Sequence, residues 1–523
     1  MYFRILIGIV AVACIRVRPT DGANILAFFP LPVYSHFSGF NPLFMELANR
    51  GHRVTVVTPF YPKGNVPSGY VHVPVPDVKI KRTATNPMDI RNAYRVQNMV
   101  NVKTNMINMV RRTLVLKETQ AFLNDTGRAF DLVLVECWYS DAYLAVGHRY
   151  GAPTVCLSPM LPSVTLCSSL AVPNNPSYVP SFWLHYPDVM SFTERLYNAA
   201  VVAAETALLS GVAGRRDEEQ EMMDAAYTYP GHENTPPLDA LRAALTLSLI
   251  NSHYSVSYAR PYPPNVVPVA GMHMMGPRSA ADVDRKLKKL LDGATDGVIY
   301  FSFGSNIKMA NLPAREVRTF VESFRKLRQT VLWKWENGTI DDLPGNVYVD
   351  KWFPQQYVLG HKNCKLFITH GGYHSLVEAL HYGLPVIGFP FYTDQYYNMR
   401  FVAEKGFGIQ ILLNDLRENV LDGAIRDVLH DPSYKENAAT ASEIFTDAPT
   451  SALDTAVYWT EYALRNGRGD RGFLRPYDLI WYQYYGLDVV GFVAVVSACA
   501  ALAVRKSVKR LRQLSGGANG TPD

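Results

Sequence analysis

Short apolar runs alternate with helical stretches along most of this chain, and a cluster of prolines interrupts the alternation once. A β-α-β rhythm of this kind predicts parallel sheets with helices on both faces. The five prolines from Pro261 to Pro277 deny a continuous helix or a central strand, which is typical of a linker. We therefore expect two α/β domains. Open parallel sheets bind ligands at the carboxyl ends of their strands.

The expected elements follow from this rhythm. In the first half we expect strands at 24–29, 54–58, 132–135 and 154–157, helices at 39–50 and 139–150, and a long helical stretch at 88–123. In the second half we expect strands at 297–303, 331–334, 347–349, 366–369 and 385–389, a helix at 315–326, and a helix that starts near Tyr373.

Both ends of the chain are typical of targeting segments. Residues 1–22 place Arg4 before an apolar run and small residues after it, as a secretory signal peptide does, although a first buried strand is the alternative. Residues 486–504 are apolar except for Asp488 and lie between an aromatic group and a basic tail at 505–523. That pattern predicts a single membrane helix with a cytoplasmic tail, the alternative being a buried core helix.

Between these ends, the expected domains are an N-terminal α/β domain at 23–260, a proline-rich linker at 261–280 and a C-terminal α/β domain at 281–485. The fold class is therefore α/β, with two Rossmann-like domains followed by one transmembrane helix. This arrangement predicts type I topology with both domains in the secretory lumen. The sequons at Asn124 and Asn337 are then expected glycosylation sites.

Composition excludes several classes of protein. Hydrophobic residues make up 48% and charged residues 19% of the 523 positions, which is a globular composition. The net charge of +5 comes from the two ends, so the body is nearly neutral and offers no general case for nucleic-acid binding. None of the cysteines shows a C-x-x-C spacing, and a bond between Cys156 and Cys167 is the pairing that could be considered. Asp282 and Asp284 form a D-x-D pattern that is better explained as a helix cap.

The densest group of polar residues lies between Trp352 and Gln395. The strand at 366–369 runs into His370, Gly371 and Gly372, and a helix follows. Glycines at such a turn let the backbone approach a ligand, and the free N–H groups of a helix N-terminus suit a diphosphate.

The remaining residues of this group suit a nucleoside and a sugar. Glu378 offers a carboxylate to a ribose diol, and Asp394 with Gln395 offers acceptors and donors to sugar hydroxyls. Upstream, Trp352 offers a flat ring to a base and Gln355 an amide to its edge.

These residues, in this order and spacing, resemble the signature of the UDP-glycosyltransferases, and in character the insect membrane-bound members. The stretch that carries the resemblance is KWFPQQYVLGH…FITHGGYHSLVEALHYGLPVIGFPFYTDQ, and the similarity extends from the signal peptide to the membrane span. It implies a GT-B fold of two domains with the UDP-sugar in the C-terminal one. It implies the UDP-sugar as co-substrate, with no metal and no other cofactor.

The resemblance also assigns roles to individual residues. Trp352 would stack on uracil, Gln355 would contact the nucleoside, and Glu378 would take the ribose hydroxyls. His370, Gly371 and Ser375 would hold the diphosphate together with Ser305, and Asp394 with Gln395 would take the sugar. His374 departs from the family, many of whose members carry Asn or another small residue there, so its contact with phosphate is open.

The acceptor side is expected in the N-terminal domain. His36 follows the first strand on a loop, and an imidazole can take a proton from a hydroxyl near neutral pH. The resemblance implies that His36 is the general base, oriented by a carboxylate that is usually an Asp. Glu136 stands at the matching position and is favoured as the partner of His36, with Asp141 as the alternative.

The expected function is inverting, metal-independent transfer of a sugar from a UDP-sugar to a hydroxyl of a small lipophilic acceptor, as in detoxification or in hormone or pigment conjugation. Glucose is favoured, because Gln395 is compatible with it and the resemblance is to insect members. A glucuronate donor would want a cation for its carboxylate, and Arg260, at the linker, is the candidate for that cation, with a structural role as its alternative. A membrane-anchored, non-catalytic UDP-sugar binder is the alternative, kept open by Glu136 and His374. The expected location is the endoplasmic reticulum membrane, and the oligomeric state is left open.

Overall fold

The computed structural model describes residues 22–78, 95–209, 215–274, 283–467 and 481–516 with residues 474 and 479, apart from residues 63, 139, 306 and 337. The chain divides into two compact units, Met1–Leu474 and Arg475–Asp523. Of the expected signal peptide, only Gly22 is among the described residues, so that expectation stays a prediction.

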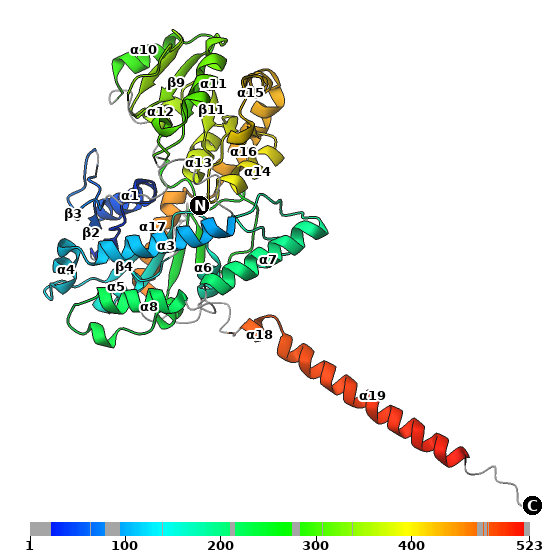
Figure 1. Cartoon of the computed structure of the whole chain (residues 1–523). Coiled ribbons are helices and arrows are strands. Elements are labelled where there is room, and N and C mark those ends of the chain that lie inside the picture. Colours follow the sequence, from blue (N-terminus) through cyan, green and yellow to red (C-terminus); the bar gives the residue numbers. More distant parts are fainter. Residues whose placement is uncertain are drawn as a thin grey trace, which may run out of the picture. The chain divides into compact units, whose positions relative to one another are not determined.

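The first sheet has seven parallel strands in the order β3-β2-β1-β4-β5-β6-β7 (Figure 1). Its strands are β1 (Asn24–Phe28), β2 (Arg53–Thr58), β3 (Tyr70–Pro74), β4 (Leu132–Glu136), β5 (Thr154–Ser158), β6 (Leu247–Ile250) and β7 (Val266–Pro268). Strands β4 and β5 are buried along their whole length, which explains why they form continuous apolar runs in the sequence.

Helices cover this sheet. They are α1 (Tyr34–Asn49), α3 (Arg95–Leu114), α4 (Lys117–Asn124), α5 (Leu144–Tyr150), α6 (Val164–Ser169), α7 (Phe192–Leu209), α8 (Arg215–Ala226), η1 (His232–Asn234) and α9 (Leu238–Ala243). Two expectations need adjustment. The described part of the stretch at 88–123 forms two helices, α3 and α4, and the helix expected at 139–150 begins only at Leu144.

The second sheet repeats the plan with six parallel strands in the order β10-β9-β8-β11-β12-β13. Its strands are β8 (Val298–Ser302), β9 (Thr330–Lys334), β10 (Val347–Asp350), β11 (Cys364–Thr369), β12 (Val386–Gly388) and β13 (Gly408–Gln410). The helices around it are α10 (Arg285–Gly293), η3 (Met309–Asn311), α11 (Ala314–Arg325), α12 (Gln355–Leu359), α13 (Tyr373–His381), α14 (Gln395–Glu404), η4 (Leu413–Asp415), α15 (Glu418–His430) and α16 (Pro432–Thr446).

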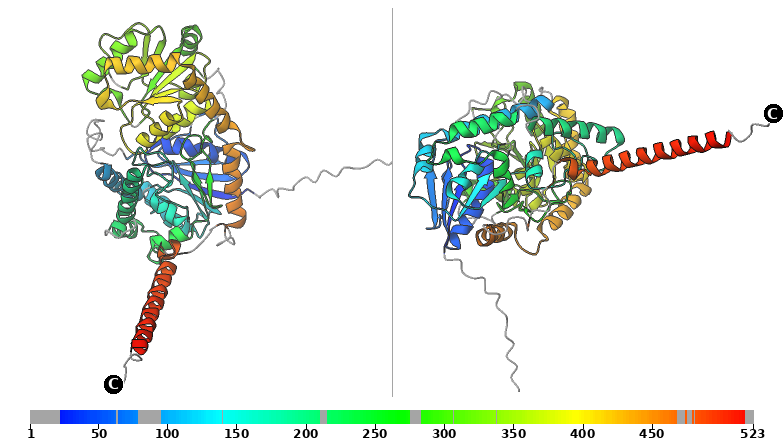
Figure 2. Two further views of the ribbon diagram at one scale, coloured as in Figure 1. Left: turned by 90° about the vertical axis from the view of Figure 1, so that its right-hand side faces the viewer. Right: turned by 90° about the horizontal axis from the view of Figure 1, so that it is seen from below.

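The expected domain boundaries are wrong in two places. Strand β7 lies inside the expected linker at 261–280, because an edge strand tolerates the neighbouring prolines that a central strand would not. Helix α17 (Ala452–Asn466) was assigned to the C-terminal domain but contacts α1 and β7 (Figure 2). Its buried residues Ala456 and Val457 complete the core of the first sheet.

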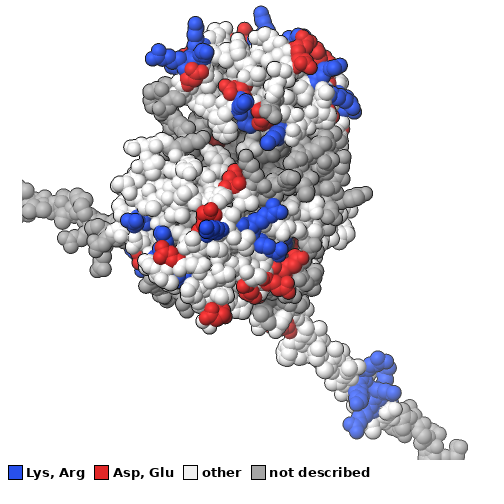
Figure 3. Space-filling view, turned by 60° about the vertical axis from the view of Figure 1, so that its left-hand side comes forward, with Lys and Arg blue, Asp and Glu red and all other residues white. Residues whose placement is uncertain are grey.

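The second unit consists of α18 (Trp481–Tyr484) and the long helix α19 (Leu487–Gly516). Residues Leu487–Leu514 are long and apolar enough to cross a membrane, and the apolar part is not buried. A core helix would be buried, so this exposure favours the prediction of a membrane span. The helix continues past the expected end at 504 and through the basic cluster, which Figure 3 shows beyond an uncharged stretch.

Candidate active site

The two sheets bring their topological switch points to one cavity. In the first sheet the strand order reverses between β1 and β4, and in the second between β8 and β11. Crevices at the carboxyl ends of such strand pairs are where open α/β sheets bind ligands. A cavity of about 2500 Å³ is lined by residues that follow these strands in both sheets. Pockets for a single small ligand measure about 300–1,000 Å³, so the cavity has room for two substrates.

His36 and Glu136 meet at the switch point of the first sheet. Glu136 is the last residue of β4, and His36 lies in the first turn of α1 rather than on the expected loop. His36 Nδ1 and Glu136 Oε1 are 2.5 Å apart, and the Glu136 side chain is only 1% exposed. Because Nδ1 is engaged by this carboxylate, Nε2 is the ring nitrogen available to a ligand in the cavity.

Asp141 does not contact His36, so it is wrong as the alternative partner. Its carboxylate accepts from Arg242 Nε at 2.6 Å, and its backbone N–H donates to Glu219 Oε1 at 2.6 Å. Ser140 donates to the same Glu219 oxygen. This buried network fixes the segment that follows Glu136.

The expected diphosphate site forms at the switch point of the second sheet. Gly372 precedes α13 without a side-chain cap, so the first N–H groups of this helix are left for a ligand. Gly371 has a φ of 79°, which favours glycine, and a Cβ at Gly304 would lie 2.8 Å from the His370 ring. A Cβ at Gly372 would overlap the same ring. Gly304 and Gly372 therefore make room for the imidazole of His370.

His370 is a neutral group in this setting. Burial, with a smaller effect from the Lys334 ammonium, lowers the pKa of His370 to about 4. Its buried Nδ1 has no hydrogen-bond partner among the described residues. Lys334 donates to the carbonyl of Gly304 at 2.9 Å and to Glu336 at 2.8 Å, so a cation lies beside the glycine turn. Ser305, which follows this turn, lines the cavity as expected.

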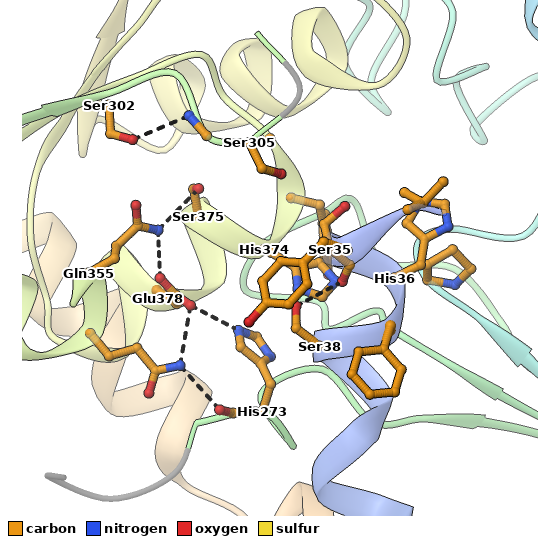
Figure 4. Close-up of a pocket in the computed structure, with 18 of the residues that line it drawn as sticks. Ser35, His36, Ser38, His273, Ser302, Ser305, Gln355, His374, Ser375 and Glu378 are labelled. Carbon is orange, nitrogen blue, oxygen red and sulfur yellow. Dashed lines mark hydrogen bonds and ion pairs between the residues drawn. The ribbon is translucent and has the colours of Figure 1, made fainter. Parts of the chain in front are cut away.

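The expected nucleoside contacts are brought together on α12 and α13 (Figure 4). Gln355 Nε2 donates to Glu378 Oε2 at 2.6 Å and approaches Ser375 Oγ at 3.3 Å. Gln356 Nε2 donates to Glu378 Oε1 at 3.2 Å. Trp352 is 53% exposed and lines the cavity, which leaves its ring accessible to a base.

Asp394 and Gln395 lie buried at the start of α14 and line the same cavity. Gln395 Oε1 accepts the backbone N–H groups of Phe391 and Tyr392, so its Nε2 group is what the side chain offers to a ligand. Burial raises the pKa of Asp394. The hydrogen bonds that its carboxylate accepts from the side chains of Asn398 and Thr393 lower this pKa by a smaller amount. Thr393 has a φ of 51°, which is strained for a β-branched residue and holds this turn in an unusual conformation.

His374 is the second residue of α13 and contacts residues of the first half of the chain. Its Nε2 is 2.9 Å from Asn251 Nδ2, and its ring stacks at a tilt on His273 with centroids 4.8 Å apart. Burial, His273 and His36 hold the pKa of His374 well below its ordinary value.

Comparison with known proteins decides the family. A sequence model described as "UDP-glucoronosyl and UDP-glucosyl transferase" matches residues 30–517. The chain belongs to the UDP-glycosyltransferases. UDP-glycosyltransferase UGT4 of Dactylopius coccus is 34% identical over 92% of this chain and 93% of the relative. UDP-glucuronosyltransferase 2A1 of Mus musculus is 31% identical over 64% of this chain and 61% of the relative.

Solved structures show the same fold. A UDP-glucosyltransferase from Polygonum tinctorium has a TM-score of 0.56 and 15% identity, covering 85% of this chain and 99% of the other. The glycosyltransferase VinC has a TM-score of 0.55 and 17% identity, covering 85% and 100%. The chain therefore has a GT-B fold, and membership of the family supports transfer of a sugar from a UDP-sugar.

Several residues of this UDP-glycosyltransferase site were not predicted from the sequence. Lys334, Gln356, His273, Asn251 and Trp138 line the cavity or contact residues that do. Gln356 is adjacent to the predicted site residue Gln355, and Lys334 is the last residue of a predicted strand. Both positions could therefore have been recognised as candidate site residues from the sequence. Asn251 and His273 come from the segment around β6 and β7, whose place beside α13 only the tertiary structure shows.

Other predicted residues lie elsewhere in the enzyme. Arg260 is half-buried and donates to the carbonyl of Pro173 and to Asn174 at 3.3 and 3.2 Å, and it is not among the residues that line the cavity. Asp284 caps α10 by accepting from Lys286 N–H, as expected, whereas residue 282 lies outside the described residues.

The structure describes one of the two predicted glycosylation sites and both cysteines of the pair that was considered. Asn124 is the last residue of α4, and the sequon residue Asn337 lies outside the described residues. Cys156 and Cys167 are free and buried, so the bond considered between them does not form. Within the described ranges, no three His, Cys, Asp or Glu side chains gather as metal ligands would.

Proposed function

We propose that this enzyme transfers glucose from UDP-glucose to a hydroxyl of a small lipophilic acceptor, in one displacement with inversion at the anomeric carbon. The observation that carries the proposal is the His36–Glu136 pair, at 2.5 Å, on one side of a cavity whose other side is the uncapped N-terminus of α13. A base and a leaving-group site that share one cavity can act on opposite faces of one sugar carbon.

The proposed reaction moves one proton and breaks one bond to the sugar. His36 Nε2 takes the proton of the acceptor hydroxyl as its oxygen attacks the anomeric carbon, and the bond to the UDP oxygen breaks with its electron pair. Glu136 stabilises the imidazolium that forms, as a buried carboxylate does in a triad. The N–H groups of α13, the nearby Lys334 ammonium and an N–H of His370 stabilise the charge that develops on the departing diphosphate. No step in this scheme calls on a metal ion.

The preference for glucose rests on the charges around the proposed sugar subsite. Asp394 and Gln395 can accept from and donate to neutral hydroxyls. A glucuronate would bring a second carboxylate close to Asp394, and Arg260 is engaged elsewhere. A neutral hexose therefore suits the subsite better than a uronic acid does.

The preference for a lipophilic acceptor rests on the cavity wall near His36. Apolar side chains are among those that line the cavity, namely Phe37, Met106, Met109, Trp138 and Met160. The Trp138 ring meets the His36 ring edge to face, with centroids 5.4 Å apart, so a flat apolar acceptor would lie against it. We further propose a lumenal, type I placement in the endoplasmic reticulum membrane, which the apolar first part of α19 and the basic cluster in its C-terminal part support.

The test compares membranes that carry the wild type with membranes that carry His36→Ala. Each is incubated with UDP-glucose or UDP-glucuronate and a panel of phenols, flavonols and aliphatic alcohols, and both UDP release and glycoside are measured. We expect acceptor-dependent turnover with UDP-glucose that is lost in the variant. Turnover with UDP-glucuronate alone would overturn the donor assignment. UDP-glucose binding without turnover on a wide panel would favour the non-catalytic binder.

A further inference from the structure

The imidazole of His374 belongs to the donor-binding helix α13 but is surrounded by the first half of the chain. The ring contacts Gly39 of α1, Asn251 after β6 and His273 after β7. Figure 4 shows the ring beside the helix that carries Ser35, His36 and Ser38. The side chain therefore bridges the two halves of the enzyme instead of lying along α13.

The contact with Gly39 has no spare room. A Cβ at position 39 would overlap Cε1 of His374 and lie 3.1 Å from Nε2. Gly39 has an ordinary helical φ, so the backbone does not require glycine there. The ring of His374 is the group that requires it. Because residues three apart lie on one face of a helix, Gly39 sits one turn below His36.

The hydrogen bond to Asn251 determines the protonation state of the His374 ring. Asn251 Nδ2 donates to the carbonyl of Pro159 at 3.0 Å and lies 2.9 Å from His374 Nε2. An amide nitrogen is a donor only, so Nε2 accepts and the ring is neutral. Burial beside His273 and His36 lowers the pKa of His374, which agrees with this neutral form. With Nε2 engaged, the ring cannot turn that nitrogen toward a phosphate without breaking this bond.

We propose that His374 is a positioning residue that holds the donor helix α13 against the base helix α1, and is not a ligand of the diphosphate. The proposal rests on the proposed function, in which His36 is the base and α13 binds the leaving group. Through His374, the distance between these two groups is set by direct packing. Loss of the ring should therefore impair the chemical step while leaving UDP binding in place.

A double-mutant cycle on the full chain in detergent tests this. The proteins are wild type, Gly39→Ala, His374→Ala and the double variant. Gly293→Ala is the control, since a Cβ at Gly293 meets no atom of the described residues within 4 Å. UDP affinity is measured by calorimetry, kcat with saturating UDP-glucose and acceptor, and the unfolding temperature by scanning. Alanine favours a helix more than glycine does, so its only penalty at position 39 is the clash with the ring.

We expect His374→Ala to lower kcat at least tenfold with UDP affinity changed by less than about threefold. Gly39→Ala should lower both kcat and the unfolding temperature in the wild-type background. In the His374→Ala background the same change should lower neither. A loss of UDP affinity of tenfold or more in His374→Ala would make this residue a phosphate ligand and overturn the proposal. Additive losses in the double variant would also overturn it.

The cycle distinguishes this inference from the proposed function. Absence of turnover in the wild type on every acceptor would count against the proposed function. The unfolding temperatures and UDP affinities do not depend on turnover. Additive unfolding temperatures would therefore overturn the role of His374 whatever the activity of the wild type.

Discussion

Replacement of Glu136 by glutamine removes the charge that faces His36 and keeps the size of the side chain. The glutamine carbonyl can still accept the Nδ1–H of a neutral imidazole, so the ground state is little changed. The imidazolium exists only once the acceptor proton has moved. We therefore expect Glu136→Gln to lower kcat and to leave the KM for the UDP-sugar and the unfolding temperature nearly unchanged.

The size of this effect follows from the burial and the distance of the pair. Glu136 is 2% exposed and its Oε1 lies 2.5 Å from His36 Nδ1. A charge-assisted hydrogen bond contributes about 1.5–3 kcal/mol, and unit charges about 4 Å apart in a partly buried site attract by about 4 kcal/mol. We therefore expect the transition state to lose about 3–4 kcal/mol of stabilisation that the ground state does not lose. Since about 1.36 kcal/mol of activation free energy changes a rate tenfold, kcat should fall by about 10²–10³.

The assay is initial UDP release with saturating donor and acceptor, together with UDP affinity by calorimetry. Asp141→Asn is the matched control, because it removes a nearby carboxylate that pairs with Arg242 instead of His36. We expect this control to lower the unfolding temperature, since removing one member of a buried ion pair costs about 3–5 kcal/mol. If Glu136→Gln kept more than about a third of wild-type kcat, the role given to the carboxylate would be refuted.

Three further predictions concern the glycine turn, acid stability and the C-terminal helix. Gly372→Ala should weaken UDP binding about tenfold or more, because its Cβ would overlap the His370 ring, whereas Gly293→Ala should have no effect by calorimetry. His370 has a pKa of about 4 when folded and near 6.5 when unfolded, so its contribution to stability is complete above about pH 6.5 and lost as the pH falls toward 4. The unfolding temperature should fall over that range, and less steeply in His370→Gln. A chain that ends before Leu487 should leave the membrane pellet in alkaline extraction.

Much of the fold could be predicted because parallel strands buried on both faces stand out as apolar runs. The strands at 132–135 and 154–157 were placed within one residue of their observed ends. The start of α1 was missed because Val33 precedes it without a side-chain cap, so no cap residue marks it. Hence His36 was expected on a loop and lies in a helix.

The domain boundaries could not be predicted because they depend on tertiary contacts. The pattern of α17 shows that it buries one face, but not that this face packs on the first sheet. Likewise, prolines marked 261–280 as irregular, although an edge strand at Val266–Pro268 tolerates them.

The donor residues were predictable because they follow one another along the chain, so their spacing could be matched to the family. The choice between Glu136 and Asp141 needed strand order, since β1 and β4 are neighbours and end side by side. The contact of His374 with Asn251 joins residues 123 positions apart and leaves no local pattern.

The central claim is that the His36–Glu136 pair directs an acceptor hydroxyl to the face of the sugar opposite UDP. It is tested most directly by proton NMR of the glycoside formed from UDP-glucose, in which the glucose is α-linked. Attack from the opposite face predicts a single product with the β configuration, formed by the wild type and absent with His36→Ala. An α-linked product, or a β-linked product that His36→Ala forms at the wild-type rate, would contradict the account.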